Sequence, residues 1–245
     1  MFRKIIQPPD WYRNKKVTVV GLGAFGGGAG VTRFLHSLGA RLTVTDIKPA
    51  AELAKETAAL ADREIRWVLG EHRDEDLLEA DLVVLNPAIP RDAPLVERCR
   101  KAGVPLETEM NLFFKHCRGK ICAITGSNGK TTTTSLVAEM ARRRWPEILI
   151  GGNIGRSLLP KVKEIAEEDW VIIELSSFQL ADLASLDQRP AISVITNLSE
   201  NHLDWHGSYD SYLEAKREIL LPGPSPDLAV LNLFDPVLQE WAAET

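Results

Sequence analysis

Cysteine is scarce in this sequence, which contains only Cys99, Cys117 and Cys122 among its 245 residues. Their spacing matches neither a zinc-binding pattern nor a disulfide framework. Cys122 also lies within an apolar run that we expect to form a buried strand. The sequence therefore excludes a small disulfide-stapled domain and favours a protein of the reducing cytoplasm.

A long apolar segment is also absent. No run approaches the roughly 20 consecutive apolar residues that a membrane-spanning helix needs, and residues 1–10 lack the apolar core of an export signal. The formal net charge is -5, from 29 basic and 34 acidic residues, so the chain has no overall attraction to nucleic acid or to anionic membranes. We expect no export, no membrane insertion and no nucleic-acid partner.

Short apolar runs, by contrast, are abundant, and helical stretches of about ten residues separate them. The runs lie at residues 17–20, 41–45, 64–69, 81–85, 121–125, 147–150, 170–174, 191–196 and 227–231. This alternation predicts the α/β class, with parallel sheets covered by helices. We expect a Rossmann-like domain over residues 1–117, followed by a P-loop-type α/β domain over residues 118–245.

The most informative stretch runs from Gly126 to Thr132 and follows the apolar run 121–125. Its glycines permit a tight turn from strand to helix, in which backbone N–H groups converge on an anion. Lys130 supplies a cation for phosphates, and a threonine hydroxyl is a natural ligand of Mg²⁺. The spacing is shorter than the common G-x-x-x-x-G-K-S/T loop, because Ile124 stands where the first glycine would be. The alternative is an ordinary turn with a solvated lysine. The predicted ATP-binding residues are Gly126, Ser127, Asn128, Gly129, Lys130, Thr131 and Thr132.

A second glycine-rich turn begins at Gly21, and the next strand ends on Asp46. This order of strand, glycine turn, helix, strand and acid is the dinucleotide-binding fingerprint, with a diphosphate at the start of the helix. The same geometry suits any nucleotide diphosphate, so an NAD-dependent oxidoreductase remains an alternative. A turn whose glycines only permit close helix packing is another.

Polar side chains follow the later strands of the second domain, namely Asn153, Glu174 and His202. Because the carboxyl ends of parallel strands meet at one edge of a sheet, we expect these residues to gather around the phosphate loop. A carboxylate at the end of an apolar strand is costly unless it meets a cation, which a Mg²⁺ shared with a threonine of the loop, Thr131 or Thr132, would supply. Glu174 could instead be a helix cap, and His202 could be an ordinary surface residue.

Lys216 lies on the apolar face of a predicted helix over residues 208–220, four residues from both Tyr212 and Leu220. Most lysines in such places extend the ammonium into water. An inward lysine would instead have a lowered pKa, because burial disfavours its charged form, and would be partly a reactive neutral amine.

Together these motifs resemble the Mur ligase family over nearly all of residues 15–240. The resemblance rests on the motifs Gly21-Leu-Gly23 with Asp46, Gly126-Ser-Asn-Gly-Lys-Thr131, Gly152-Asn-Ile-Gly155, Glu174-Leu-Ser-Ser-Phe-Gln-Leu180, and Asn197-Leu-Ser-Glu-Asn-His-Leu-Asp204 with Lys216. The string that starts at Glu174 is the most specific. Another Mur ligase, or a ligase like folylpolyglutamate synthase, is the alternative within this resemblance.

The resemblance implies an ATP-dependent ligase of cytoplasmic peptidoglycan-precursor synthesis, which adds D-glutamate to UDP-N-acetylmuramoyl-L-alanine through an acyl phosphate. The catalytic residues that it implies are Lys130, Glu174, His202 and Lys216. It implies one Mg²⁺ on Thr131 and Glu174, and a second on His202 and a carbamylated Lys216. The residues that it implies for the UDP-linked substrate are Gly23, Ala24, Phe25, Asp46 and Asn153.

Two departures from the family pattern concern the first domain. Phe25 stands where a small or hydroxyl residue is frequent, and Asn86-Pro-Ala88 stands where Ser-Pro-Gly is common. The family also has a third, carboxyl-terminal domain that these residues do not supply. We therefore expect the chain to be inactive alone, either as part of the ligase with a separately encoded third domain or as a fragment that only binds nucleotide and precursor. We also expect a monomer.

Overall fold

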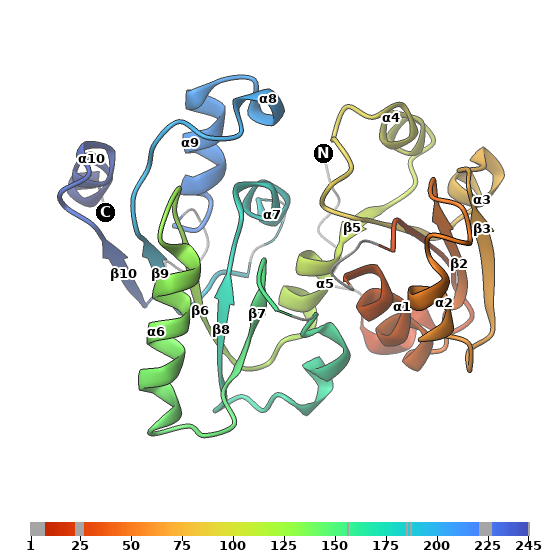
Figure 1. Ribbon diagram of the computed structural model, residues 1–245, viewed down its shortest axis with the longest axis horizontal. Coiled ribbons are helices and arrows are strands. Elements are labelled where there is room, and N and C mark those ends of the chain that lie inside the picture. Colours follow the sequence, from red (N-terminus) through yellow and green to blue (C-terminus); the bar gives the residue numbers. More distant parts are fainter. Residues whose placement is uncertain are drawn as a thin grey trace. The chain divides into compact units, whose positions relative to one another are not determined.

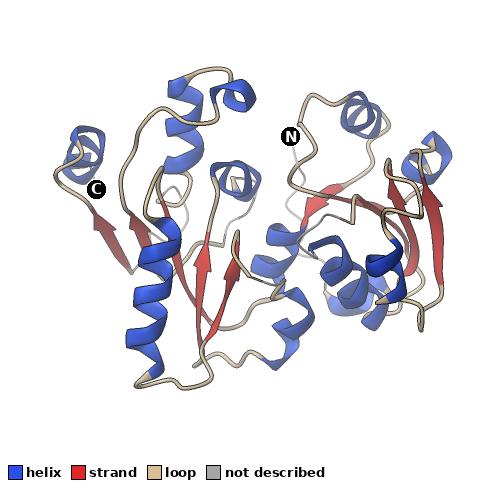
Figure 2. Ribbon diagram, in the orientation of Figure 1, coloured by secondary structure: helices blue, strands red, loops and turns tan. Residues whose placement is uncertain are grey.

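The computed structural model describes residues 8–22, 27–155, 157–184, 186, 188–220 and 227–244 (Figure 1). The chain divides into two compact units, residues 1–113 and 114–245. The division falls within helix α5 (Glu109–His116), a little before the boundary expected at residue 117. Each unit has a five-stranded parallel sheet with helices against it, as Figure 2 shows, so the predicted α/β class is confirmed.

The first sheet has the strand order β3-β2-β1-β4-β5, which is the order of the nucleotide-binding Rossmann fold. Its strands are β1 (Lys16–Val20), β2 (Arg41–Asp46), β3 (Ile65–Leu69), β4 (Leu82–Leu85) and β5 (Leu106–Thr108). The sequence predicts the first four strands. It misses β5, because three residues with a glutamate in the middle do not form an apolar run.

The helices of the first unit cover this sheet and close its core. They are η1 (Pro9–Tyr12), α1 (Gly27–Ser37), α2 (Ala54–Ala58), α3 (Asp74–Leu78), α4 (Pro94–Lys101) and the first part of α5. Helix α4 begins at a proline, whose fixed φ suits the first turn, and ends in basic residues that favour the negative end of the helix dipole. Val96 and Cys99, three residues apart, lie on its buried face and pack against Val83 of the sheet.

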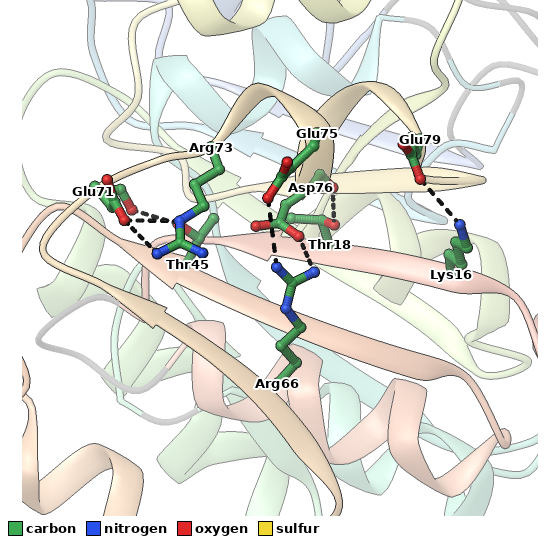
Figure 3. Close-up of polar contacts among 9 residues, drawn as sticks. All are labelled: Lys16, Thr18, Thr45, Arg66, Glu71, Arg73, Glu75, Asp76 and Glu79. Carbon is green, nitrogen blue, oxygen red and sulfur yellow. Dashed lines mark hydrogen bonds and ion pairs between the residues drawn. The ribbon is translucent and has the colours of Figure 1, made fainter.

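Polar and charged contacts join α3 and Glu79, which follows it, to strands β1 and β3 (Figure 3). The guanidinium of Arg66 on β3 pairs with the buried carboxylate of Asp76, and the hydroxyl of Thr18 donates to the Asp76 carbonyl at 2.5 Å. Lys16 pairs with Glu79 at 3.3 Å. Because Lys16 and Glu79 are exposed, their pair contributes little to stability, whereas the buried Asp76 depends on its partner.

The second sheet has the order β10-β9-β6-β8-β7, also entirely parallel. Its strands are β6 (Lys120–Thr125), β7 (Leu149–Gly152), β8 (Trp170–Glu174), β9 (Ile192–Ile195) and β10 (Leu228–Leu231), and each overlaps a run predicted from the sequence. In addition to the end of α5, the helical elements are α6 (Lys130–Arg142), η2 (Leu159–Glu164), α7 (Ser177–Leu183), α8 (Leu203–His206), α9 (Tyr209–Arg217) and α10 (Pro236–Glu244). Strand β6 is central, so the loop that follows it has a paired strand on each side.

Strand β10 lies at the edge of the second sheet. Within the described residues it pairs only with β9, and its Leu228 and Val230 are exposed. Among the helices described, none has both the length and the apolar character needed to cross a membrane.

Candidate functional site

The turn between β6 and α6 has the geometry of a phosphate-binding loop. Gly126 and Gly129 adopt positive φ angles of 147° and 76°. A Cβ on Gly126 would lie 2.0 Å from Oγ1 of Thr196, so only glycine fits at this position. Helix α6 begins at Lys130, and the first N–H groups of a helix have no partner within it. These donors and the positive end of the helix dipole favour an anion at the turn.

The side chain of Lys130 folds back over this turn. Its Nζ donates to the carbonyl of Gly126 at 3.0 Å and to the carbonyl of Ser127 at 2.9 Å. Both partners are neutral, and a hydrogen bond from an ammonium to an anionic oxygen is stronger than one to a carbonyl. A phosphate bound at the turn would therefore compete well for this ammonium.

The segment after β9 fastens the loop. Ser127 donates its N–H to the carbonyl of Asn197 at 2.8 Å, and Asn128 donates its N–H to Oδ1 of Asn197 at 3.0 Å. The hydroxyl of Thr196 donates to the Asn128 carbonyl at 2.6 Å. Neither Thr196 nor Asn197 was predicted to have this role from the sequence, although polar residues directly after a buried strand are a signal that could indicate one.

Glu174, Thr131 and Asn153 meet at the carboxyl end of β8, as predicted. Glu174 is only 1% exposed. Its Oε2 accepts from the Thr131 hydroxyl at 2.8 Å, and its Oε1 accepts from the side-chain amide of Asn153 at 3.0 Å. Ser176, not Glu174, caps helix α7, which excludes the helix-cap alternative.

The same group supplies oxygen ligands of the kind that Mg²⁺ prefers, because the Glu174 carboxylate and the Thr131 hydroxyl lie within 2.8 Å of each other. These two residues therefore fit a magnesium ion. No cluster of three or more histidine, cysteine, aspartate or glutamate side chains suited to a metal occurs in the described part of the chain.

Lys216 points inward and is 2% exposed, so it does not extend its ammonium into water. Its Nζ donates to Oγ1 of Thr125 at 2.8 Å and to the carbonyl of Gly126 at 3.1 Å. Burial, with a smaller contribution from the charge of Lys130, lowers the pKa of Lys216 to about 7, and Glu174 opposes this shift. Near neutral pH the lysine is thus partly an unprotonated amine.

His202 does not share the contacts of Glu174 and Lys216. It precedes α8 with a positive φ of 52°, its side chain is exposed, and its ring centre lies 4.9 Å from that of Phe178. No hydrogen bond described in the structure joins His202 to Glu174 or Lys216. The nearby His206 has Nε2 2.8 Å from the hydroxyl of Ser177. The structure thus brings Lys130, Thr131, Asn153, Glu174 and Lys216 to one loop but leaves His202 outside their hydrogen bonds.

In the first unit, Asp46 ends β2 and is 7% exposed. Its Oδ2 accepts the N–H of Leu22 at 2.9 Å and its Oδ1 accepts the N–H of Lys48 at 3.0 Å, so the carboxylate holds the start of the glycine turn. A Cβ on Gly28 would lie 2.4 Å from the carbonyl of Gly21, which shows how closely α1 approaches that turn. Gly23, Ala24 and Phe25 lie outside the described residues.

The segment Asn86-Pro-Ala88 follows β4 in the same unit. The side-chain carbonyl of Asn86 accepts the N–H of Ala88 at 3.0 Å, which closes a local turn. A Cβ on Gly21 would lie 2.9 Å from Cβ of Asn86, so this turn packs directly against the glycine turn.

Comparison with known proteins gives consistent results for both units. Residues 15–107 match the family model described as "Mur ligase MurD-like, N-terminal domain", and residues 124–245 match the "Mur ligase middle domain". A UDP-N-acetylmuramoylalanine--D-glutamate ligase of Roseiflexus sp. (strain RS-1) is 42% identical over 228 residues, which are 93% of this chain and 49% of that protein. The ligase of the same name from Geobacillus kaustophilus (strain HTA426) is 40% identical over 239 residues, 97% of this chain and 52% of that one.

The chain thus spans about half the length of the curated relatives that it matches. Solved structures share the fold. The UDP-N-acetylmuramate-alanine ligase MurC of Thermotoga maritima aligns with a TM-score of 0.58 and 24% identity, over 93% of this chain and 51% of that chain. The UDP-N-acetylmuramate:L-alanyl-gamma-D-glutamyl-meso-diaminopimelate ligase of Neisseria meningitides aligns with a TM-score of 0.64 and 18% identity, over 95% and 75%. With both of its units matched by family models, the chain belongs to the Mur ligase family, of which it carries a MurD-like amino-terminal domain and the middle domain.

Proposed function

We propose that this chain forms the substrate-binding and ATP-binding part of a ligase that joins D-glutamate to UDP-N-acetylmuramoyl-L-alanine. The observation that carries the proposal is the contact of the buried Glu174 carboxylate with both Thr131 and Asn153, beside the loop that holds Lys130. A phosphate-binding loop, a carboxylate for Mg²⁺ and an amide for the substrate then share one edge of the sheet. Relatives with this printed activity at about 40% identity support the proposal.

In this proposal the reaction has two steps. A carboxylate oxygen of the precursor attacks the γ-phosphorus of ATP, forming an acyl phosphate as the bond to ADP breaks. The amine of D-glutamate then attacks the acyl carbon, loses a proton and expels phosphate. Mg²⁺ would supply positive charge that neutralises the phosphate oxygens in the first step.

The chain's own residues position the reactants. Lys130 would exchange its two carbonyl partners for the outer phosphates, because it is already held at the loop. The loop residues Gly126, Ser127, Asn128, Gly129, Thr131 and Thr132 would surround these phosphates. Thr131 and Glu174 would hold one Mg²⁺, while Asn153 would lend its amide to the precursor.

A carbamate on Lys216 would provide a ligand for a second Mg²⁺, together with His202. Carbon dioxide adds only to an unprotonated amine, forming an N–C bond and releasing a proton. The inward orientation and the lowered pKa of Lys216 support this assignment. The side chain would have to leave Thr125 and Gly126 for its carbamate to reach a metal.

The first unit would bind the UDP end of the precursor through its glycine turn. The hydrogen bond from the N–H of Leu22 to Asp46, which holds that turn, supports this role, and Asp46 at the end of β2 would lie near the ribose or base. Gly23, Ala24 and Phe25 would contact the diphosphate. We retain residues 1–117 and 118–245 as the two functional domains of this proposal.

A titration of the 245-residue chain tests the proposal. We expect Mg²⁺-dependent binding of ATP and ADP, independent binding of UDP-N-acetylmuramoyl-L-alanine, and no binding of NADH. Lys130→Ala should weaken ATP binding at least tenfold, a loss of about 1.4 kcal/mol, while Lys161→Ala, an exposed lysine of the same unit, should not. Failure of the unsubstituted chain to bind either nucleotide class would refute the proposal.

The half-length coverage of the relatives favours a second candidate, in which these residues bind both substrates without completing the reaction. Orientation of the amine against the acyl phosphate contributes about 7 to 11 kcal/mol in well-aligned reactions, and further residues would have to supply it. An amide-product assay with ATP, Mg²⁺, precursor and D-glutamate separates the two candidates. Product at about 1 s⁻¹ or faster would establish the ligase and exclude the binding-only candidate.

A further inference from the structure

Tyr212 connects helix α9 to the phosphate loop. Its hydroxyl lies 2.7 Å from Oγ of Ser127, and its side chain is 1% exposed. From the sequence, Tyr212 was predicted only to lie on the apolar face of the helix. Its contact with the loop therefore needs its own explanation.

The direction of this hydrogen bond follows from counting protons. Oγ of Ser127 accepts the N–H of Ser199 at 2.8 Å and lies 3.0 Å from the carbonyl oxygen of Ser199. A carbonyl cannot donate, so the single hydroxyl proton of Ser127 points to that carbonyl. Tyr212 must then be the donor to Ser127. The serine hydroxyl thus has its proton and both of its lone pairs engaged.

Helix α9 contacts three successive residues of the chain at this loop. Lys216, one turn after Tyr212, donates to Thr125 and Gly126, while Tyr212 donates to Ser127. The Nζ of Lys216 lies 5.5 Å from the centre of the Tyr212 ring. The two side chains therefore hold one short segment from the same helix.

These two contacts respond differently to charge. The bonds from Lys216 weaken when the lysine loses its proton, because a neutral amine donates less strongly than an ammonium, and they change again when the amine reacts. Burial raises the pKa of Tyr212, so its phenol stays a neutral donor across the physiological range. Of these two contacts, only the one from Lys216 comes from a group that titrates near neutral pH.

Ser127 in turn matters to the proposed phosphate site. Its carbonyl accepts from Lys130 at 2.9 Å, and its N–H donates to Asn197. A shift of Ser127 would therefore move both the resting position of the lysine and the attachment of the loop to the segment after β9.

We propose that Tyr212 is a positioning residue for phosphate binding, whose hydrogen bond to Ser127 keeps the loop in the conformation that accepts a nucleotide. This inference rests on the proposed ATP site and adds to it a residue outside that site. Tyr212 itself would touch neither nucleotide nor metal.

Calorimetric titration with Mg²⁺ and ADP tests the inference. Tyr212→Phe removes only the hydroxyl, and we expect ADP to bind about five- to tenfold more weakly, the size of one lost hydrogen bond. Affinity for UDP-N-acetylmuramoyl-L-alanine should not change, since its UDP end is assigned to the other unit and Asn153, which would reach it from this unit, is hydrogen-bonded to Glu174 and not to Ser127 or Tyr212. Tyr209→Phe is the matched control, because it removes the hydroxyl of the neighbouring tyrosine on the same helix.

Ser127→Ala removes the acceptor and gives a second route to the same answer. It should weaken ADP binding on its own, and Tyr212→Phe should then cause no additional loss in the double variant. Unchanged ADP affinity in Tyr212→Phe, or independent losses that multiply in the double variant, would overturn the inference. A purely structural tyrosine would lower the melting temperature and both ligand affinities together. If the unsubstituted chain bound no ADP, the proposed function itself would fall.

Discussion

Nζ of Lys216 lies 2.8 Å from Oγ1 of Thr125, although 91 positions separate the two residues. The Thr125 hydroxyl donates to the carbonyl of Leu175 at 2.6 Å, so it can only accept from the lysine. This contact buries an amine at the end of the central strand, directly behind the phosphate loop. Because Lys216 belongs to helix α9 and donates to Thr125 and Gly126, its protonation state bears on the contact between that helix and the loop.

The first prediction concerns stability and pH. The pKa of Lys216 is lowered to about 7 in the folded chain, so between pH 7 and its ordinary value of 10.5 the unfolded chain binds more protons. The free energy of unfolding should therefore rise with pH in this window, by up to about 1.4 kcal/mol per pH unit. This gain in stability is lost as the pH falls back to 7. Urea unfolding from pH 7 to 8.5, in buffers free of carbon dioxide, measures the slope.

Lys216→Met is the comparison for this experiment, because methionine keeps an unbranched side chain at this buried position but has no titrating group. The difference between the two slopes isolates Lys216 from other titrations. The range stops at pH 8.5 because burial raises the pKa of Cys122 to about 11, and that group acts in the opposite direction once unfolded thiols ionise. Parallel slopes in the two proteins would contradict the prediction.

The second prediction is that Lys216 forms a carbamate. With ¹³C-bicarbonate and Mg²⁺ at about pH 8, where most of a group with a pKa near 7 is unprotonated, we expect a carbamate carbon signal by NMR. The signal should be absent in Lys216→Ala and retained in Lys120→Ala, which removes an exposed lysine of the same unit. A signal that survives in Lys216→Ala would assign the carbamate elsewhere.

The third prediction concerns Glu174. Glu174→Gln removes the negative charge while its carbonyl oxygen can still accept from Asn153, so the local fold should persist. We expect Mg²⁺ to lose most of its effect on ADP affinity, whereas metal-free ADP binding changes little or improves. Glu167→Gln, an exposed carboxylate that pairs with Arg118, is the control. An unaltered dependence on Mg²⁺ in Glu174→Gln would remove this residue from the proposed metal site.

The fourth prediction concerns Gly126. An alanine there would place its Cβ 2.0 Å from Oγ1 of Thr196 at a φ of 147°, so both the loop and the segment after β9 would have to move. We expect Gly126→Ala to lower the unfolding free energy by about 2 kcal/mol or more and to abolish ADP binding. Urea unfolding and the ADP titration measure the two effects.

Gly155→Ala provides the contrast for this substitution. Gly155 also has a positive φ, of 75°, but a Cβ on it would meet no atom within 4 Å. Only the backbone cost of about 1 kcal/mol should remain. Equal losses in the two variants would mean that the contact with Thr196 contributes nothing.

Several features of this protein follow from local sequence alone. Of the ten strands in the described residues, nine were predictable, because strands of a parallel sheet are mostly apolar runs, and β5 was missed because it is short and contains Glu107. The meeting of Asn153, Glu174 and Thr131 was also predictable, since parallel strands deliver the residues after them to one edge of a sheet.

The tertiary structure decided what periodicity leaves open. Helical spacing put Lys216 on an apolar face, but only the docking of α9 behind the loop turned its ammonium toward Thr125 rather than water. The same docking brought Tyr212 to Ser127, and the strand order brought Thr196 against Gly126. Sequence patterns record which face of a segment is apolar and where a strand ends, whereas the partner of a buried polar atom depends on how separate segments pack.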